Sequence, residues 1–130
     1  MTLKTIEWKD NSVIMIDQTK LPNSLEYVTY TDYNDVATAI RNLVVRGAPA
    51  IGVSGAFGLA LAALQSSAKE KDQLIQDLET AKKILFETRP TAINLVWGLE
   101  KIMSVTKGDK TVEQIRGSII ETAKQMARDD

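Results

Sequence analysis

The stretch PAIGVSGAFGLALAALQ, residues 49–65, decides the fold of this chain. Pro49 suits the first turn of a helix, where its missing N–H costs no hydrogen bond. The stretch is apolar on nearly every side, so the helix that it predicts must be buried all round. It falls just short of a comfortable membrane span and is rich in Gly and Ala. We therefore expect a central core helix surrounded by other helices, and not a membrane helix.

Glycines recur at a regular spacing in this predicted helix, at Gly52, Gly55 and Gly58. Each one costs about 1 kcal/mol relative to alanine in a helix interior. The spacing indicates that something approaches this side closely, either another helix or a ligand, and we expect helix packing. A dinucleotide-binding fingerprint would need a preceding strand and a glycine-rich turn, which this helical spacing does not provide.

The rest of the chain predicts an α+β fold in which strands come first and helices follow. Alternating apolar residues and turn signals predict an antiparallel meander of about three strands within residues 1–30. A helical period then continues through residues 31–130 and predicts a bundle of about five helices. We expect one domain over residues 1–130. The predicted strands are 6–8, 13–16 and 25–30, and the predicted helices are 31–46, 49–65, 70–88, a helix after Pro90 with Thr91 as its N-cap, and one after Lys110.

Apolar stripes mark the inner faces of the later helices. Thr111 and Gln114 fit a capping box at the start of the last helix. We expect Trp8 and Trp97 to be core anchors. The inner stripes are Leu74, Leu78, Ala81 and Leu85 in the third helix, Ala92, Leu95, Val96, Leu99 and Ile102 or Met103 in the fourth, and Val112, Ile115, Ile119, Ala123 and Met126 in the last.

The composition limits the chemistry that these residues can perform. The formal net charge is −1, with basic and acidic residues interspersed, so charge does not favour a nucleic-acid partner. Histidine and cysteine are both absent from the sequence. This excludes a zinc site of the Cys/His type, a thiol nucleophile and a histidine base. The N-terminal residues MTLKTIEWKD lack the apolar run of a signal peptide.

Arg46 and Gly47 directly precede the central helix. The first turn of a helix offers unpaired N–H groups and a partial positive charge. An arginine added to such a turn can hold a phosphate group. The alternative is that Arg46 is a solvated loop cation.

Arg89 extends the stripe of the third helix by one more step of four residues, so its side chain should point toward the interior or a cleft. Pro90 then ends the helix, and another helix follows. Arg89 could instead cap the carbonyl groups of its own helix. The sharper interpretation is that Arg46 and Arg89 hold one phosphate group between them.

Two motifs carry a resemblance to a known family. They are Val-Arg-Gly-Ala-Pro-Ala-Ile-Gly at 45–52 and Thr-Arg-Pro-Thr-Ala-Ile-Asn-Leu at 88–95, the latter followed by Val96-Trp97. Together they resemble the 5-methylthioribose-1-phosphate isomerases, and Ile-Glu-Trp at 6–8 also fits. The wider family includes ribose-1,5-bisphosphate isomerases and regulatory subunits of the translation-initiation guanine-nucleotide exchange factor.

The resemblance implies an aldose–ketose isomerisation in methionine salvage, without a metal or an organic cofactor. It implies that this chain is only an N-terminal domain, inactive alone, and that a larger Rossmann-like domain carries the catalytic cysteine and aspartate. It further implies a cytoplasmic protein that is a homodimer at full length. The substrate contacts that it assigns here are Arg46, Gly47, Ala48 and Arg89, with Thr91 and Asn94 lining the same cleft.

Two other functions compete with this one. The chain could be a non-catalytic regulatory domain from a translation-factor relative, or a free-standing module that binds phosphorylated metabolites. The last helix has no Gly or Pro to end it after Ala127, and acidic residues at a helix C-terminus oppose the helix dipole. This favours a chain that continues into a further domain.

Overall fold

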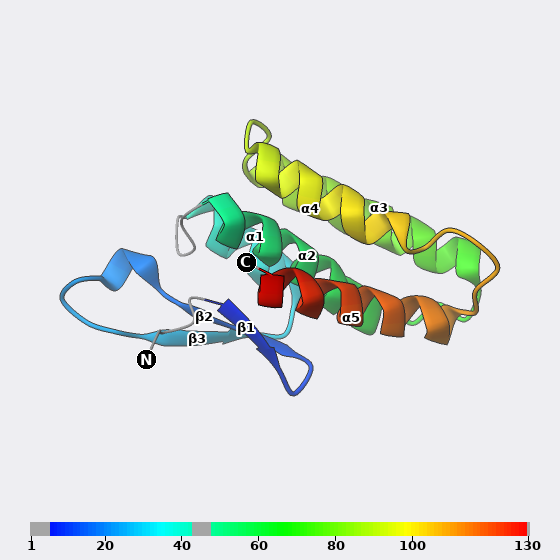
Figure 1. Cartoon of the computed structure of the whole chain (residues 1–130), viewed down its shortest axis with the longest axis horizontal. Helices are drawn as coiled ribbons and strands as arrows, with labels where there is room; N and C mark the ends of the chain where they lie inside the picture. The colour runs from blue at the N-terminus through cyan, green and yellow to red at the C-terminus, as the bar shows by residue number, and fades with distance from the viewer. Residues whose placement is uncertain (1–5, 43–47, 130) are drawn as a thin grey trace.

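The computed structural model describes residues 6–42 and 48–129. A three-stranded antiparallel sheet comes first and five α-helices follow, so the predicted α+β fold is confirmed (Figure 1). A short 3₁₀ turn, η1 (Gln18–Lys20), lies between the second and third strands. The elements are β1 (Ile6–Lys9), β2 (Ser12–Ile16), β3 (Tyr27–Tyr30), α1 (Tyr33–Arg41), α2 (Ala48–Gln65), α3 (Lys71–Thr88), α4 (Ile93–Ser104) and α5 (Val112–Asp129).

The sheet is a meander in the order β1-β2-β3, with Trp8 opposite Val13 in the first pair. Asp10 and Asn11 form the predicted turn, with φ angles of 53° and 59°. Positive φ at both central residues matches the right-handed twist of a hairpin. The ring of Trp8 lies 5.6 Å from that of Phe57 in α2, which attaches the sheet to the central helix.

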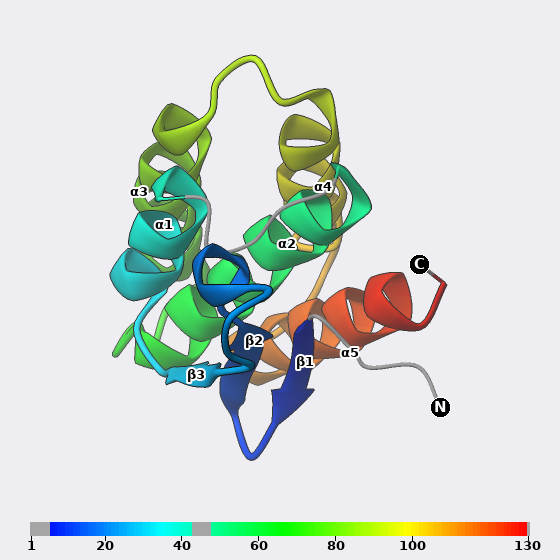
Figure 2. The same cartoon turned by 90° about the vertical axis from the view of Figure 1, so that its left-hand side faces the viewer.

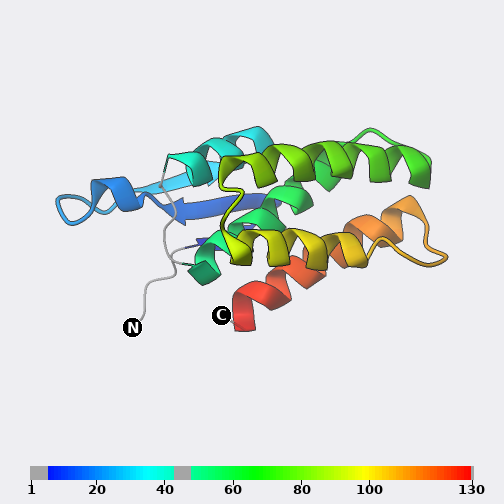
Figure 3. The ribbon, with the colours of Figure 1, turned by 90° about the horizontal axis from the view of Figure 1, so that it is seen from above.

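α2 is the central helix, as its composition predicts. It contacts α1, α3, α4, α5 and β1, and its contact with α4 is the most extensive. Seen from above, α2 runs between the α1–α3 pair and the α4–α5 pair (Figure 3). None of the helices in residues 6–42 and 48–129 combines the length and the apolarity that a membrane crossing requires.

Helix boundaries and inner faces follow the sequence pattern closely. α1 begins after Asp32, whose side chain accepts the Asn34 N–H, but the described part of the helix ends at Arg41. The predicted continuation to residue 46 falls partly in residues 43–47, outside the described residues. Each predicted stripe residue of α3 and α5 is buried. The capping box of α5 is confirmed by hydrogen bonds of 2.8 Å from the Thr111 N–H to Gln114 and 3.1 Å from the Gln114 N–H to the Thr111 hydroxyl.

Thr91 is not the N-cap of the fourth helix, so that prediction is wrong. The Ala92 N–H donates to the Arg89 carbonyl at 3.0 Å, which closes a four-residue turn with Pro90 at its second position. Proline favours that position because its fixed φ suits the turn. The turn delays the helix, so Ala92 becomes the N-cap and makes no side-chain capping bond.

Trp97 is not a core anchor either, because its side chain is 56% exposed. The inner face of α4 is occupied by Leu95, Gly98 and Leu99, which places Trp97 on the opposite side. Val96, which was predicted to face inward, is only half-buried. The third strand also begins two residues later than predicted, at Tyr27, and Leu25 is exposed.

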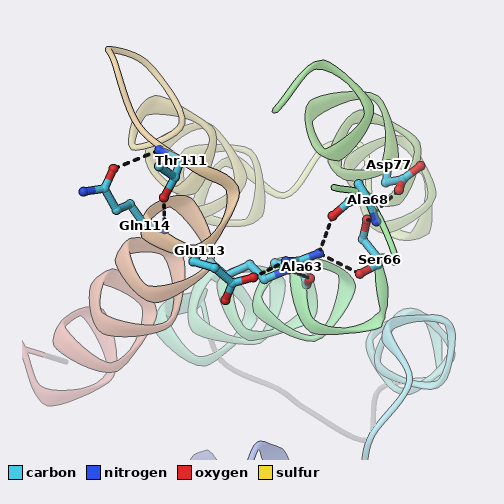
Figure 4. Close-up of polar contacts among 8 residues, drawn as sticks. Ala63, Ser66, Ala68, Asp77, Thr111, Glu113 and Gln114 are labelled. Carbon is cyan, nitrogen blue, oxygen red and sulfur yellow. Dashed lines mark hydrogen bonds and ion pairs between the residues drawn. The ribbon is translucent and has the colours of Figure 1, made fainter. Parts of the chain in front are cut away.

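Arg116 of α5 fastens the carboxyl end of α2 (Figure 4). Its Nε donates to the Ala63 carbonyl at 2.8 Å, and its Nη2 donates to the carbonyls of Ser66 and Ala68 at 2.8 and 3.1 Å. The last carbonyls of a helix have no partner within the helix, so a guanidinium group suits this place.

Candidate functional site

Glycines let the first half of α2 lie directly against the first half of α4. A Cβ atom built on Gly98 would stand 2.5 Å from the Gly52 carbonyl oxygen, and one built on Gly52 would stand 2.7 Å from the Asn94 carbonyl oxygen. Side-chain carbons do not pack this closely against backbone oxygens, so both positions require glycine. The backbones of the two helices therefore touch at this crossing.

The other two glycines of α2 also face neighbouring helices. A Cβ atom on Gly55 would stand 2.6 Å from Leu95, and one on Gly58 would stand 3.0 Å from Leu85. The glycine spacing thus serves close helix packing, as predicted, and each glycine of this row faces protein atoms.

The crossing brings the amino ends of α2 and α4 to one end of the molecule. Figure 2 looks onto this end and shows the turn at 89–92 beside them. The N–H groups of Ile93 and Asn94, in the first turn of α4, have no acceptor among the described residues. The first turn of α4 therefore brings free donors and a positive partial charge to this corner, beside the start of α2.

The predicted site residues of the second motif lie at this corner. Arg89 is half-buried at the end of α3, and its backbone N–H donates to the Phe86 carbonyl at 3.3 Å. Its guanidinium has no hydrogen-bond or ion-pair partner within the part of the chain that the structure describes, so it does not cap its own helix there. Asn94 is half-buried against Gly52, and Thr91 is exposed in the turn.

The first motif lies mostly outside the described residues. Arg46 and Gly47 belong to residues 43–47, and Ala48 is the first residue of α2. The structure brings together the start of α2, Asn94 and the corner that carries Arg89. That the two guanidinium groups converge on one ligand stays a prediction.

Shifted titratable groups lie at the other end of α2, near Gln65, which accepts the Tyr33 N–H at 2.8 Å. The Asn34 N–H lowers the pKa of Asp32, and burial raises the pKa of Tyr30, helped by the nearby Asp17 and Asp35 carboxylates. Among the described residues, no cluster of acidic side chains could hold a metal ion. Neither of these two shifted groups belongs to the corner at 89–94.

Sequence reasoning did not single out Gly98, which sets the distance between the two motifs. A glycine inside a helix is costly, so its position in α4 is itself a signal of close approach. The helix that it approaches could not be identified from local pattern.

Comparison with known proteins places this geometry in context. Residues 44–130 match the Initiation factor 2 subunit family. The chain is 50% identical over 113 residues to a methylthioribose-1-phosphate isomerase from a Geobacter species, covering 87% of this chain and 33% of that protein. It is 42% identical over 132 residues to the enzyme of the same name from Geobacter sulfurreducens, covering 100% of this chain and 38% of that protein. The chain thus spans about a third of the length of these relatives.

Two solved structures share this fold equally well. The 5-methylthioribose 1-phosphate isomerase from Pyrococcus horikoshii superposes with a TM-score of 0.92 at 39% identity, covering 99% of this chain and 37% of that one. The translation initiation factor eIF-2B, subunit delta, from A. fulgidus gives a TM-score of 0.92 at 39% identity, covering 99% of this chain and 38% of that one. The fold alone therefore does not separate an enzyme from an initiation-factor subunit.

Proposed function

The chain belongs to the Initiation factor 2 subunit family, and from this premise we propose that it forms the substrate-binding part of an isomerase. The reaction is the conversion of 5-methylthioribose 1-phosphate to 5-methylthioribulose 1-phosphate, a step of methionine salvage in the cytoplasm. The observation that carries the proposal is the Gly52–Gly98 crossing, which sets the start of α2 beside the corner at 89–94. Relatives of 42% to 50% identity that are named methylthioribose-1-phosphate isomerase support it.

The chemistry of the substrate explains why such a corner is needed. The phosphate sits on the anomeric carbon, so ordinary ring opening is blocked. The enzyme must hold this phosphate firmly while an acid–base pair acts elsewhere on the sugar. In our proposal, Arg46, Gly47, Ala48 and Arg89 hold the phosphate, and Thr91 and Asn94 line the cleft.

The acid–base pair belongs, in this proposal, to a larger Rossmann-like domain that follows residue 130 in a full-length homodimer. The absence of cysteine and histidine from these 130 residues is consistent with that division of roles. The segment alone is then inactive, because it binds the phosphate and lacks the groups that move the protons. No metal and no organic cofactor takes part in this scheme.

Arginine substitutions in the full-length protein test the proposal. A charge-assisted hydrogen bond contributes roughly 1.5–3 kcal/mol, so Arg46→Ala or Arg89→Ala should weaken substrate binding about ten- to a hundredfold. The measurement is the kcat and KM of isomerisation, with a direct binding titration. Lys69→Ala is the matched control, because it also removes one positive charge but lies in the loop between α2 and α3, at the opposite end of α2. A change below about twofold in affinity and turnover for an arginine variant would remove that arginine from the site.

A second function is a regulatory or scaffold domain of an initiation-factor subunit. The match to the eIF-2B delta structure supports this second function, because its TM-score and identity equal those of the match to the isomerase. This function predicts no turnover of 5-methylthioribose 1-phosphate by the full-length protein. Ribose 1,5-bisphosphate is the comparison substrate in the same assay, because a preference for it would point to the related bisphosphate isomerases.

A further inference from the structure

The outer face of α4 exposes large apolar side chains. Ile93 is 81% exposed and Trp97, one turn later on the same face, is 56% exposed. Lys101 covers part of the Trp97 ring, with its Nζ 5.0 Å from the ring centroid. Isoleucine is among the side chains most often buried in folded proteins. The exposure of Ile93 and Trp97 on one face of α4 indicates that another protein surface covers this face.

A shallow groove continues this face toward α3. Phe86, which is 39% exposed, and Val96 both line the groove, and Val96 stands three positions after Ile93 on the same helix. Lys82 and Glu100 also line the groove and form a salt bridge of 2.6 Å. We call Ile93, Val96 and Trp97 of α4, together with the neighbouring Phe86 of α3, the α4 strip.

The α4 strip borders the candidate site. Ile93 lies between Ala92 and Asn94 in the first turn of α4, and Phe86 lies one turn before the end of α3, where Arg89 stands. The carboxyl end of α5 emerges at this same end of the molecule, close to the start of α2 (Figures 1 and 3).

Two features thus lie next to each other: an uncovered apolar strip, and the corner that carries Arg89 and the first turn of α4. The relatives are about three times as long as this chain, which covers 33% to 38% of them. A second copy of residues 1–130 seated on the strip would bring no histidine or cysteine to the corner. A surface that supplies the missing acid–base groups has to dock next to the corner, where the strip lies.

We propose that the α4 strip is the surface against which the part of the polypeptide beyond residue 130 packs, through apolar side chains of its own. The proposal rests on the proposed function in one respect, namely that a longer chain completes the site. Packing on the strip would bury Ile93 and Trp97 and hold the catalytic part over Arg89 and Asn94. The strip is then the element that aligns the two halves of the active site.

Thiol labelling of the full-length protein tests this interface. Residues 1–130 contain no cysteine, so Ile93→Cys places one thiol in this part of the chain, and peptide mass spectrometry follows its reaction with a maleimide. Thr80→Cys, on the exposed side of α3, is the matched control. We expect Ile93→Cys to react at least about tenfold more slowly than Thr80→Cys in the native protein, because reaction requires local opening of the interface. Denaturant should make the two rates equal.

A photo-crosslinker on the same thiol identifies what covers the strip. Crosslinks to peptides beyond residue 130 support the proposal, whereas crosslinks to residues 1–130 of a second copy, or labelling as fast as that of Thr80→Cys, overturn it. Trp97→Cys repeats the measurement if Ile93→Cys does not fold. The isomerase assay is read separately, on the protein with its native residues. Protection of the strip without turnover would overturn the proposed function alone, and turnover without protection would overturn the interface alone.

Discussion

Arg116 shows how a single side chain completes the packing of a buried helix. Its guanidinium donates to three backbone carbonyls at and just beyond the end of α2, and its side chain is only 15% exposed. The carbonyls of Ala63, Ser66 and Ala68 would otherwise lack these donors. Because α2 contacts every other helix, loosening its end weakens the whole bundle.

Replacing this arginine should therefore destabilise the protein well beyond the effect of an ordinary surface change. We expect Arg116→Met, which keeps much of the apolar stem, to lower the free energy of unfolding by about 2–3 kcal/mol, the cost of losing hydrogen bonds to a charged donor. Urea denaturation followed by circular dichroism measures this. Glu113→Gln is the control: Glu113 pairs with Arg116 at 2.9 Å but is 84% exposed, so its loss should cost less than about 1 kcal/mol. Equal effects of the two variants would contradict this account.

The crossing of α2 and α4 makes a sharper prediction, because two effects of opposite sign compete in it. Alanine is the better helix former by about 1 kcal/mol, but a methyl group on Gly98 would meet the backbone oxygen of Gly52 at 2.5 Å. Backbone cannot move aside as a flexible side chain can, and overpacking costs about 1–3 kcal/mol. We expect Gly98→Ala to lower both the stability and, in the full-length protein, the substrate affinity.

Gly117 is the matched control for that substitution. It also lies inside a helix, α5, but a Cβ atom there would have no neighbour within 4 Å. Gly117→Ala should therefore stabilise the protein by about 0.5–1 kcal/mol. If the two glycines responded alike to alanine in urea denaturation, close contact at the crossing would not be the reason for Gly98.

The local sequence pattern was sufficient to predict most of the elements, because the spacing of apolar residues shows which face of each helix is buried. The stripes of α3 and α5 and the capping box at Thr111 are properties of residues close in sequence. It failed at Thr91, where the turn closed by Arg89 and Ala92 took precedence over a side-chain cap. The prediction for Trp97 failed because residue type alone does not show which side of a helix faces the core, and Trp97 lies on the exposed side of α4. The corner at 89–94 could be predicted as a helix end, but its contact with α2 depends on a long-range crossing.

The described residues form one hydrophobic cluster, which includes Ile6, Val13 and Met15 of the sheet together with side chains from every helix. The sheet has only three strands, and a small sheet needs a further surface to bury its apolar face. Trp8 packs on Phe57 of α2, so the sheet buries its apolar face against the core of the helical bundle. Sheet and helices should therefore lose their structure together.

This expectation can be measured in a variant with a single tryptophan. The sequence has two tryptophans, and Trp97→Phe leaves Trp8 as the reporter of the sheet while circular dichroism at the helical minimum reports the bundle. Trp97 is 56% exposed in this structure, so its replacement should leave the stability of residues 1–130 nearly unchanged. Because α2 carries both the sheet and the other helices, the two signals should give the same urea midpoint, as a cooperative two-state transition requires. A Trp8 transition at a clearly lower urea concentration than the helical one would mean that the sheet unfolds before the helices. The contact of Trp8 with Phe57 would then not couple the sheet to the helical core.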